Sequence, residues 1–449
     1  MPSPGYGLER MPPQTVELSM IVKNEARTLT RCLTSVRAAV DRIVIGDTGS
    51  TDETISIAQS YGAEIVPVLW TGDFAAARNT VLRHSRCDWI FVLDADEMLD
   101  AGGAEKLKHL IQQPGPAAYD IWRWNYVLET NSRSGEQGGL QNPQLLAESH
   151  MFPAYVKSLN TRLFRRNPEV YFERPVHETV VYRLQTLALP VATAPFVIHH
   201  LGQAEDNKVD RARKNELYHQ IGLQHLQANP DDARTCFELG LGELEHFKRP
   251  EAALSLFVRA LSINPRDCNA LIFAGVCMVR MQRYTEALDL LSRARELNSG
   301  SIVLDEAMGD AYFHQQQHAQ AFAAYESAML KGSASALVLA KWGVCKLYLG
   351  QREPGLQDLR QALQREPGFP ELLDLVAVGA ALAQDNPFAA AIARKRLPME
   401  GTSAFHYALA CILLRLSGDW TVHQEVVHEG LTRFPHDPSL SAEHAMIHL

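Results

Sequence analysis

These 449 residues contain no apolar run of about eighteen residues, which is the length that a helix needs to cross a bilayer. They also contain no run dense in Lys and Arg, and the formal net charge is −9. Neither a transmembrane protein nor a nucleic-acid-binding protein is therefore expected. Residues 1–14 are rich in Pro and Gly and lack the apolar core of a signal peptide, so we expect a flexible N-terminus over residues 1–14.

Paired cysteines are absent as well. The seven cysteines lie far apart, and none forms a Cys-x-x-Cys pair or has the spacing of a zinc site. An odd number of scattered thiols is typical of the reducing cytosol, and we expect a cytoplasmic protein. The length exceeds that of one ordinary core, so two or three domains are expected.

The first hundred residues alternate between short apolar runs and amphipathic segments. The pattern predicts strands near 18–22, 42–46, 64–68 and 88–92, with helices near 29–36 and 53–61. Ser50 or Thr51 is expected to cap the second helix. Alternating strands and helices indicate a doubly wound α/β domain, in which ligands bind beyond the carboxyl ends of the strands.

Polar residues stand at those strand ends. Asn24 and Glu25 follow the first predicted strand, Asp47 ends the second, and Asp94 and Asp96 follow the fourth. Alternate residues of a strand share a face, and two adjacent carboxylates repel each other unless a cation or hydrogen-bond donors separate them. The pair therefore favours a divalent cation with oxygen ligands. On spacing alone a solvated acidic turn remains the alternative, and Glu97 is either part of this site or a hydrogen-bonded neighbour.

Four motifs in this region carry a family resemblance: Val22-Lys23-Asn24-Glu25, residues 44–52 (VIGDTGSTD), residues 73–79 (DFAAARN) and residues 93–97 (LDADE). Together they resemble the nucleotide-sugar half of family-2 glycosyltransferases with the GT-A (Rossmann-like) fold, over about residues 15–204. The resemblance implies that Asp47 holds the uracil, that Arg78 binds the nucleotide, and that Asp94 and Asp96 serve the ribose and an Mn²⁺ or Mg²⁺ ion. Asn24 and Glu25 belong to the same nucleotide-sugar site. Lys23 stands where many members place an aromatic residue.

Two later segments supply further candidates by the same resemblance. In Arg174-Pro175-Val176-His177-Glu178, Glu178 is the expected general base of an inverting transfer, and His177 either assists it or is structural. In residues 196–202 (FVIHHLG), His200 is the histidine expected to complete the metal site with Asp96, and His199 is the alternative.

The second half of the chain has a period of 34 residues. Gly275, Gly309 and Gly343 share this spacing, as do two alanine series, Ala253, Ala287 and Ala321, and Ala260, Ala294, Ala328 and Ala362. A 34-residue unit with small residues at fixed positions is the signature of the tetratricopeptide repeat (TPR), which predicts an all-α superhelix over 231–449. Residues 205–230 are expected to form a linker helix.

A TPR array usually binds peptides or proteins in its groove. The combination resembles the sublancin-type peptide glycosyltransferases, which implies transfer of a sugar from a UDP-sugar to a peptide or protein side chain held by the array. A cell-surface glycan or a lipid-linked core is the alternative acceptor, and a scaffold without catalysis is the alternative function. A homodimer is also compatible with the sequence, which leaves the oligomeric state open.

Overall fold

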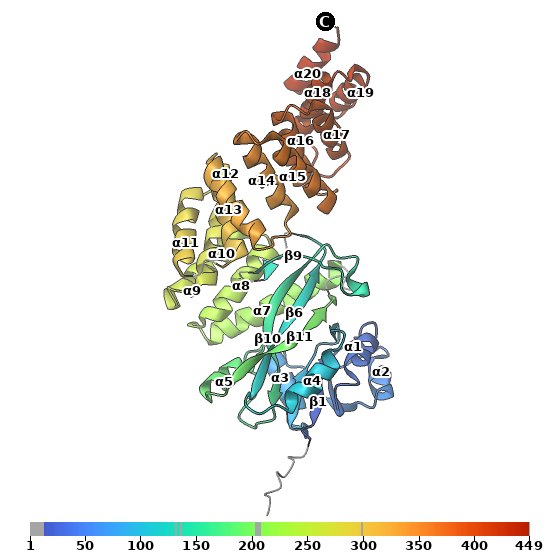
Figure 1. Cartoon of the computed structure of the whole chain (residues 1–449), viewed down its shortest axis with the longest axis vertical. Helices are drawn as coiled ribbons and strands as arrows, with labels where there is room; N and C mark the ends of the chain where they lie inside the picture. Colours follow the sequence, from blue (N-terminus) through green and yellow to red (C-terminus); the bar gives the residue numbers. More distant parts are fainter. Residues whose placement is uncertain (1–12, 131–132, 135–136, 203–207, 298–299, 449) are drawn as a thin grey trace, which may run out of the picture. The chain divides into compact units, whose positions relative to one another are not determined.

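The computed structural model describes residues 13–448, with gaps at 131–132, 135–136, 203–207 and 298–299. The expected flexible N-terminus lies almost entirely outside the described residues. The chain divides into two compact units (Figure 1): Met1–Tyr126 with Lys157–Gly242, and Val127–Val156 with Glu243–Leu449. The helix after residue 207 thus groups with the N-terminal unit, whereas an internal segment of the N-terminal half groups with the repeats.

The first unit is built on one twisted sheet. Its strands and helices are β1 (Val16–Val22), α1 (Leu29–Val36), β2 (Arg42–Asp47), α2 (Thr54–Ser60), β3 (Glu64–Pro67), α3 (Phe74–Leu82), β4 (Trp89–Val92), β5 (Glu97–Leu99), α4 (Gly103–Ile111), β6 (Ala118–Val127), β10 (Ala154–Arg165), α5 (Val181–Thr186), β11 (Val191–His200) and α7 (Lys208–Ala228). Within the described residues the strand order is β3-β2-β1-β4-β10-β6-β11-β5.

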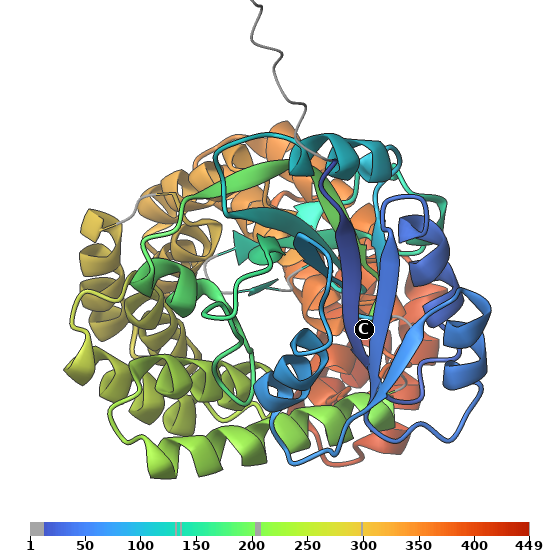
Figure 2. The same ribbon diagram turned by 90° about the horizontal axis from the view of Figure 1, so that it is seen from below.

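Strands β3, β2, β1 and β4 are parallel, so the predicted doubly wound half is confirmed. Helices cover both faces of these strands (Figure 2). Leu18 and Met20 of β1 pack with α1 on one face, and Val44 of β2 packs with Val81 of α3 on the other. This burial fixes the register, because a shift by one residue would turn each apolar side chain to the opposite face.

The start of α2 differs from the prediction. The helix begins at Thr54, and its N-cap residue, Glu53, makes no capping hydrogen bond through its side chain. The Ser50 hydroxyl accepts a hydrogen bond from the Asn24 backbone N–H (3.0 Å), and the Thr51 hydroxyl donates to the Asn24 side chain (3.3 Å). Both predicted caps are therefore engaged by the end of β1.

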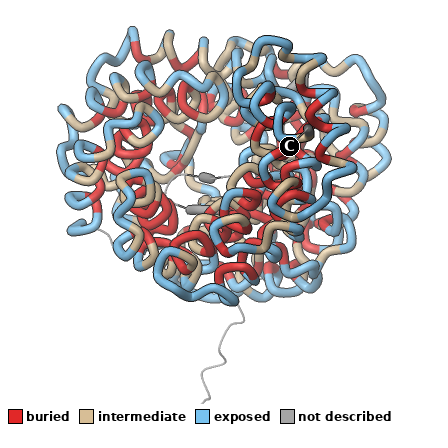
Figure 3. The backbone as a smooth tube through the Cα atoms, turned by 90° about the horizontal axis from the view of Figure 1, so that it is seen from above, coloured by how far each residue is buried: buried red, intermediate tan, exposed pale blue. Residues whose placement is uncertain are grey.

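The second unit consists mainly of antiparallel helix pairs, as the 34-residue period predicts. Its helices are α8 (Ala233–Glu245, which begins in the first unit), α9 (Pro250–Ile263), α10 (Cys268–Arg280), α11 (Tyr284–Leu297), α12 (Ile302–His314), α13 (His318–Leu330), α14 (Ala336–Tyr348), α15 (Arg352–Arg365), α16 (Pro370–Leu382), α17 (Asn386–Arg396), α18 (Ala404–Ser417), α19 (Trp420–Arg433) and α20 (Pro438–Ala445), followed by the 3₁₀ turn η2 (Met446–His448). In the tube of Figure 3, buried and exposed stretches alternate along successive helices.

The repeated glycines lie where the two helices of a pair approach each other closely. A Cβ atom on Gly275 would lie 2.7 Å from the Leu291 side chain, and one on Gly309 would lie 2.4 Å from the Tyr325 ring. The repeated alanines Ala260, Ala294, Ala328 and Ala362 are fully buried. The 34-residue period therefore arises from the positions at which helices pack closely. The predicted TPR array is confirmed.

The segment 127–156 joins two strands of the sheet but packs on the repeats. It contains β7 (Arg133–Ser134), β8 (Gln137–Gly138), β9 (Leu140–Gln141) and η1 (Ala147–Ser149). The Thr130 hydroxyl donates to Glu366 Oε1 (2.7 Å) and accepts from the Ala336 backbone N–H (3.0 Å). Val127 and Val156 are buried against Ala334. The sheet of the first unit and the helical array are therefore interleaved in sequence.

None of the seven cysteines, all of which the structure describes, forms a disulfide. In the part of the chain that the structure describes, no helix combines the length and the apolar character needed to span a membrane.

Candidate active site

The ends of β1 and β2 are joined by a network around Asn24 and Asp47. Asn24 has a left-handed backbone (φ 57°), and its side-chain oxygen accepts from the Thr51 N–H (2.8 Å). The Asp47 carboxylate accepts from the backbone N–H groups of Gly49 and Ser50 (3.2 and 3.0 Å). These hydrogen bonds fix the Asp47 carboxylate at the sheet edge while leaving it half-buried, within reach of a ligand.

Glu25 has a more local set of contacts. Its backbone N–H donates to the Thr54 hydroxyl (2.7 Å), and its carboxylate accepts from the Thr28 hydroxyl (3.0 Å). Its carbonyl also accepts from the Leu29 N–H at the start of α1 (3.0 Å). Glu25 therefore organises the β1–α1 turn next to Asn24.

Asp94 lies among three arginines. Its carboxylate is 2.6 Å from Arg78, 3.1 Å from Arg162 and 4.0 Å from Arg123. Burial disfavours the ionised form, but Arg162 and Arg78 outweigh it and hold the Asp94 pKa well below its usual range. Asp94 is therefore a fixed anion at neutral pH.

Glu97 is fully buried beneath Asp94 and belongs to the same network. Its Oε1 accepts from Arg123 (3.1 Å) and Arg162 (3.0 Å), and its Oε2 accepts from the Asp94 backbone N–H (2.9 Å). Of the two roles left open by the sequence, the structure favours the hydrogen-bonded neighbour. Glu97 orients the arginines that face Asp94.

Arg78 connects Asp94 to Glu178. Its side chain is almost completely buried, with Nε 2.5 Å from Glu178 Oε1 and a terminal nitrogen 2.6 Å from Asp94 Oδ1. Burial opposes the positive charge, yet Glu178 and Asp94 raise the Arg78 pKa above its usual value. Removing the guanidinium would leave Glu178 without its cation, whereas Asp94 would keep Arg162. Breaking a buried ion pair by removing one partner typically costs about 3–5 kcal/mol.

The loop that carries Glu178 is held by α3. The Asn79 side chain donates to the Phe172 carbonyl (2.8 Å) and accepts from the Phe172 N–H (2.8 Å). The Phe74 N–H donates to the Pro175 carbonyl (2.9 Å). Residues 73–79 therefore place the loop, and Arg78 completes the attachment by binding Glu178.

The same loop is also held by α8. Arg174, in a left-handed conformation (φ 83°), donates to the Thr235 hydroxyl (2.7 Å) and lies 3.2 Å from Asp232. Thr235 hydrogen bonds, together with Arg174, outweigh burial and lower the Asp232 pKa to about 2. His177 also has a positive φ (54°), and its side chain is exposed.

Asp96 faces His200 across the sheet edge. Asp96 Oδ2 is 3.0 Å from His200 Nε2, and His200 Nδ1 is 2.9 Å from Asn125 Oδ1. Although burial raises the Asp96 pKa, His200 outweighs it, and the net pKa is lowered. A Cβ atom on Gly202 would lie 2.1 Å from Asp96 Oδ2, so only glycine leaves room for this pair.

His199 points into the interior instead. It is buried, its Nδ1 is 3.0 Å from the Tyr126 hydroxyl, and its ring lies edge-on to Trp124. Adjacent residues of a strand face opposite sides, so only one of the two histidines reaches Asp96.

The residues that face the sheet edge can contribute two metal ligands, Asp96 and His200. Among the described residues, no group of three His, Cys, Asp or Glu side chains is arranged to hold an ion. Mg²⁺ in phosphate-transfer sites is commonly held by one or two protein carboxylates with substrate phosphates and waters. The pair therefore fits an ion that arrives with a diphosphate.

Most sequence candidates lie at one sheet edge, where Arg78 binds both Asp94 and Glu178, and Asp96 pairs with His200. Asn24 and Asp47 form the neighbouring turn. The sequence did not single out Arg123, Arg162 or Asn125, which also belong to this site. They lie on β6 and β10, outside every recognisable motif.

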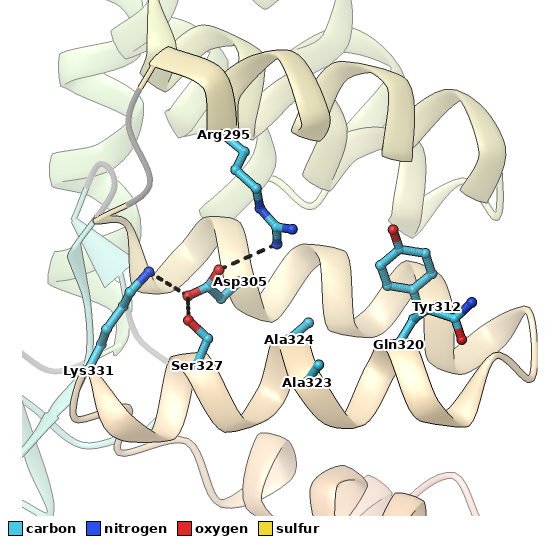
Figure 4. Close-up of a pocket in the computed structure, with 8 residues that line it drawn as sticks. All are labelled: Arg295, Asp305, Tyr312, Gln320, Ala323, Ala324, Ser327 and Lys331. Atoms are coloured by element: carbon cyan, nitrogen blue, oxygen red, sulfur yellow. Dashed lines mark hydrogen bonds and ion pairs between the residues drawn. The ribbon is translucent and has the colours of Figure 1, made fainter.

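The array has a polar pocket of its own, of about 340 Å³ (Figure 4). At its floor the buried Asp305 carboxylate accepts from Ser327 and Lys331 (both 2.6 Å), and Arg295 lies 3.6 Å from its other oxygen. Ala323 and Ala324 line the pocket from α13 and leave its space open because their side chains are short. Two cations around one carboxylate give the pocket a net positive charge.

Comparisons with known proteins agree with this architecture. Residues 18–169 match the family described as Glycosyl transferase family 2. A TPR repeat-containing protein of Synechococcus elongatus is 34% identical over 231 residues, which cover 50% of this chain and 51% of that protein. Glycosyltransferase SunS of Bacillus subtilis is 24% identical over 261 residues, which cover 57% of this chain and 55% of SunS.

An uncharacterized glycosyltransferase of Rickettsia bellii is 31% identical over 100 residues, 22% of this chain and 34% of that protein. The chain thus spans about half, or less, of the length of these curated relatives. The family match covers β1 to β10, which carry Asp47, Arg78, Asp94 and Asp96. The N-terminal part of this chain is a family-2 glycosyltransferase domain, and a TPR array follows it.

Proposed function

We propose that this chain transfers a sugar from a nucleotide-sugar donor to a peptide or protein side chain, with inversion at the anomeric carbon. The observation that carries the proposal is the buried Arg78, which is bound to both Asp94 and Glu178 beside the Asp96–His200 pair. A scaffold without catalysis would not need three arginines and four carboxylates at one sheet edge, because buried charges rarely stabilise a fold.

The donor is a UDP-sugar in this proposal. Asp47, held by the N–H groups of Gly49 and Ser50, accepts a hydrogen bond from the uracil ring. Asp94, a fixed anion, accepts from the ribose hydroxyls. Asn24 joins the ends of β1 and β2 through three hydrogen bonds to residues 50 and 51. These hydrogen bonds offset the conformational free energy that a left-handed backbone costs a residue other than glycine.

Asp96 and His200 are the residues that would hold an Mn²⁺ or Mg²⁺ ion. When bound, such an ion neutralises charge on the departing diphosphate as a Lewis acid. Gly202 and Asn125 are required by the same arrangement, because Gly202 leaves space for Asp96 and Asn125 orients the imidazole.

Glu178 is the proposed general base. The acceptor atom attacks the anomeric carbon from the face opposite the diphosphate, its proton passes to Glu178, and the bond between the sugar and the diphosphate breaks. Arg78 binds Glu178 at Oε1 and so orients the carboxylate. Among the described residues, no hydrogen bond engages Oε2, which leaves that oxygen available to the acceptor.

The acceptor is a peptide or protein bound by the array. Helical repeats present extended surfaces for such ligands, and the pocket around Asp305, Arg295 and Lys331 offers polar contacts to an extended chain (Figure 4). Seven cysteines without a disulfide are compatible with a reaction in the cytoplasm. A glycan or lipid-linked acceptor is the second candidate, since the catalytic residues themselves do not select the acceptor.

A thermal-shift panel tests the proposal. UDP-, GDP- and dTDP-sugars are each measured with and without MnCl₂, because a ligand that binds only the folded state raises its stability by RT ln(1 + [L]/Kd). We expect a UDP-sugar to give the largest shift and Mn²⁺ to increase it. The absence of a shift with every nucleotide sugar, together with no release of nucleotide, would favour the scaffold.

A further inference from the structure

Helix α7 belongs to the same compact unit as α3 and the loop that carries Glu178. The ring of Tyr218 is 5.5 Å from the Phe74 ring and nearly perpendicular to it, and it is 6.5 Å from the His177 imidazole. Phe74 begins the helix that carries Arg78, and His177 precedes Glu178. Tyr218 therefore contacts both segments that form the Arg78–Glu178 ion pair.

The surroundings of Tyr218 are charged. Its pKa is raised to about 12, mainly by burial and also by the negative charges of Asp94, Glu178 and Asp96. Lys214 has the opposite effect on this pKa. The phenol is therefore neutral at physiological pH and is a hydrogen-bond donor close to the catalytic carboxylates. Lys214 lies one turn earlier on the same helix face and also lowers the Asp96 pKa.

The hydroxyl of Tyr218 is available for a ligand. Its side chain is half-buried, and within the described part of the chain no hydrogen bond engages this hydroxyl. A tyrosine at the rim of a site usually packs its ring on apolar surface and keeps its hydroxyl for a polar partner. A hexose offers both surfaces, since it presents C–H groups on its ring faces and hydroxyl groups at its edge.

We propose that Tyr218 forms a wall of the subsite for the transferred sugar, with its ring packed on the sugar and its hydroxyl donating to a sugar hydroxyl. This inference rests on the proposed glycosyltransferase function. It makes α7, which follows the last strand of the sheet, a part of the donor site. Tyr218 then contributes to the choice of sugar, whereas Asp47 and Asp94 contact the nucleotide.

Binding of UDP and of UDP-sugars by calorimetry separates this role from structural support. The full-length wild type, Tyr218→Leu and Tyr218→Phe are titrated with UDP, UDP-glucose and UDP-N-acetylglucosamine in MnCl₂. Leu217→Ala is the matched control, because Leu217 is the neighbouring residue on α7 and its side chain is exposed. Thermal melting of each variant shows that it is folded.

We expect Tyr218→Leu to weaken the better-bound UDP-sugar by roughly three- to tenfold while the affinity for UDP stays that of the wild type. Tyr218→Phe keeps the aromatic ring, so its affinity for the UDP-sugar should fall less than that of Tyr218→Leu. An equal loss for UDP and UDP-sugar would show that Tyr218 only supports the loop, and a loss no larger than that of Leu217→Ala would also overturn the inference. If the wild type itself binds neither sugar nucleotide nor UDP, the proposed function fails instead.

Discussion

Asp94 and Asp96 are separated by one residue and have opposite surroundings. Asp94 is bound by arginines from α3 and β10, which satisfy both of its oxygens, whereas Asp96 faces a single histidine. A carboxylate already neutralised by two guanidinium groups is a poor metal ligand. The structure therefore divides the Asp-x-Asp motif into a fixed anion and a residue that can exchange its partner for a cation.

Gly202→Ala tests how closely Asp96 and His200 must approach. The new Cβ atom would overlap Asp96 Oδ2 at 2.1 Å and force the pair apart. Since a misplacement of about 1 Å in a catalytic group can cost roughly a hundredfold in rate, we expect a loss of that order in UDP release. Gly242→Ala is the control, because a Cβ atom there meets no atom within 4 Å. Activity of Gly202→Ala equal to that of the control would show that the close pair is dispensable.

Glu178→Gln tests the general base. The amide keeps the shape of the side chain but cannot take up the proton of the acceptor, so the rate of transfer or hydrolysis should fall by roughly a hundredfold or more. Donor affinity, measured by calorimetry, should remain near that of the wild type. A parallel loss of donor affinity would instead identify Glu178 as a nucleotide contact, and the base would then lie among the acids near Asp94.

The candidate residues at strand ends could be predicted because their motifs are contiguous in the sequence. Arg162 and Arg123 could not, since each lies in a strand whose pairing is set by contacts distant in the sequence. The pairing of Phe91 with Leu163 brings β10 beside β4 and with it Arg162 next to Asp94. Likewise, His199 and His200 are equivalent in sequence and are distinguished only by the face of β11 on which each lies.

At the scale of elements, the loop 170–178 depends on two helices. Helix α3 holds it through Asn79, Phe74 and Arg78. Helix α8 holds it through Thr235, together with Asp232 just before the helix. The strands and the repeat period were predictable because each has a local periodicity. The attachment of α7 and α8 to the loop was not, because Arg174 and Asp232 are partners across 58 residues without a shared pattern.

Asp232→Asn tests the attachment of the loop to α8. The Asp232 pKa is lowered to about 2 in the folded protein, so its ionised form stabilises the fold above the unfolded pKa of about 3.9. The stabilisation by the ionised Asp232 is lost as the pH falls from about 3.9 to about 2. At pH 7 we expect the variant to unfold at a lower urea concentration than the wild type. The difference between the two urea midpoints should become smaller as the pH approaches 3. A difference that does not depend on pH would mean that the charge of Asp232 has no role.

On the scale of the whole molecule, the boundary of the catalytic unit lies later than the end of α7. The contacts assign residues up to Gly242 to that unit, including Asp232 and Thr235, which bind Arg174. The family motifs gave the identity of both halves but not this boundary, because the first repeat helix has the same pattern as the others.

Two truncations test this boundary. A chain that ends at Gly242 keeps the partners of Arg174 and should release UDP from a UDP-sugar at a rate near that of the full chain. A chain that ends at Asn229 lacks them and should release UDP more slowly. Transfer to a peptide acceptor should fall in both, because the array that supplies binding and positioning is absent. Equal UDP release by the two truncations would show that α8 does not support the loop.

The central claim is that a sugar nucleotide is cleaved at the Asp96–His200 edge of the sheet. It is tested most directly by UDP release from UDP-glucose and UDP-N-acetylglucosamine, with MnCl₂ or with EDTA, by the wild type, by Asp96→Ala and by the control Asp289→Ala, whose side chain is exposed on α11. We predict Mn²⁺-dependent release by the wild type and by Asp289→Ala, and none above background by a folded Asp96→Ala. Release that persists in EDTA and in Asp96→Ala at the wild-type rate would contradict the account.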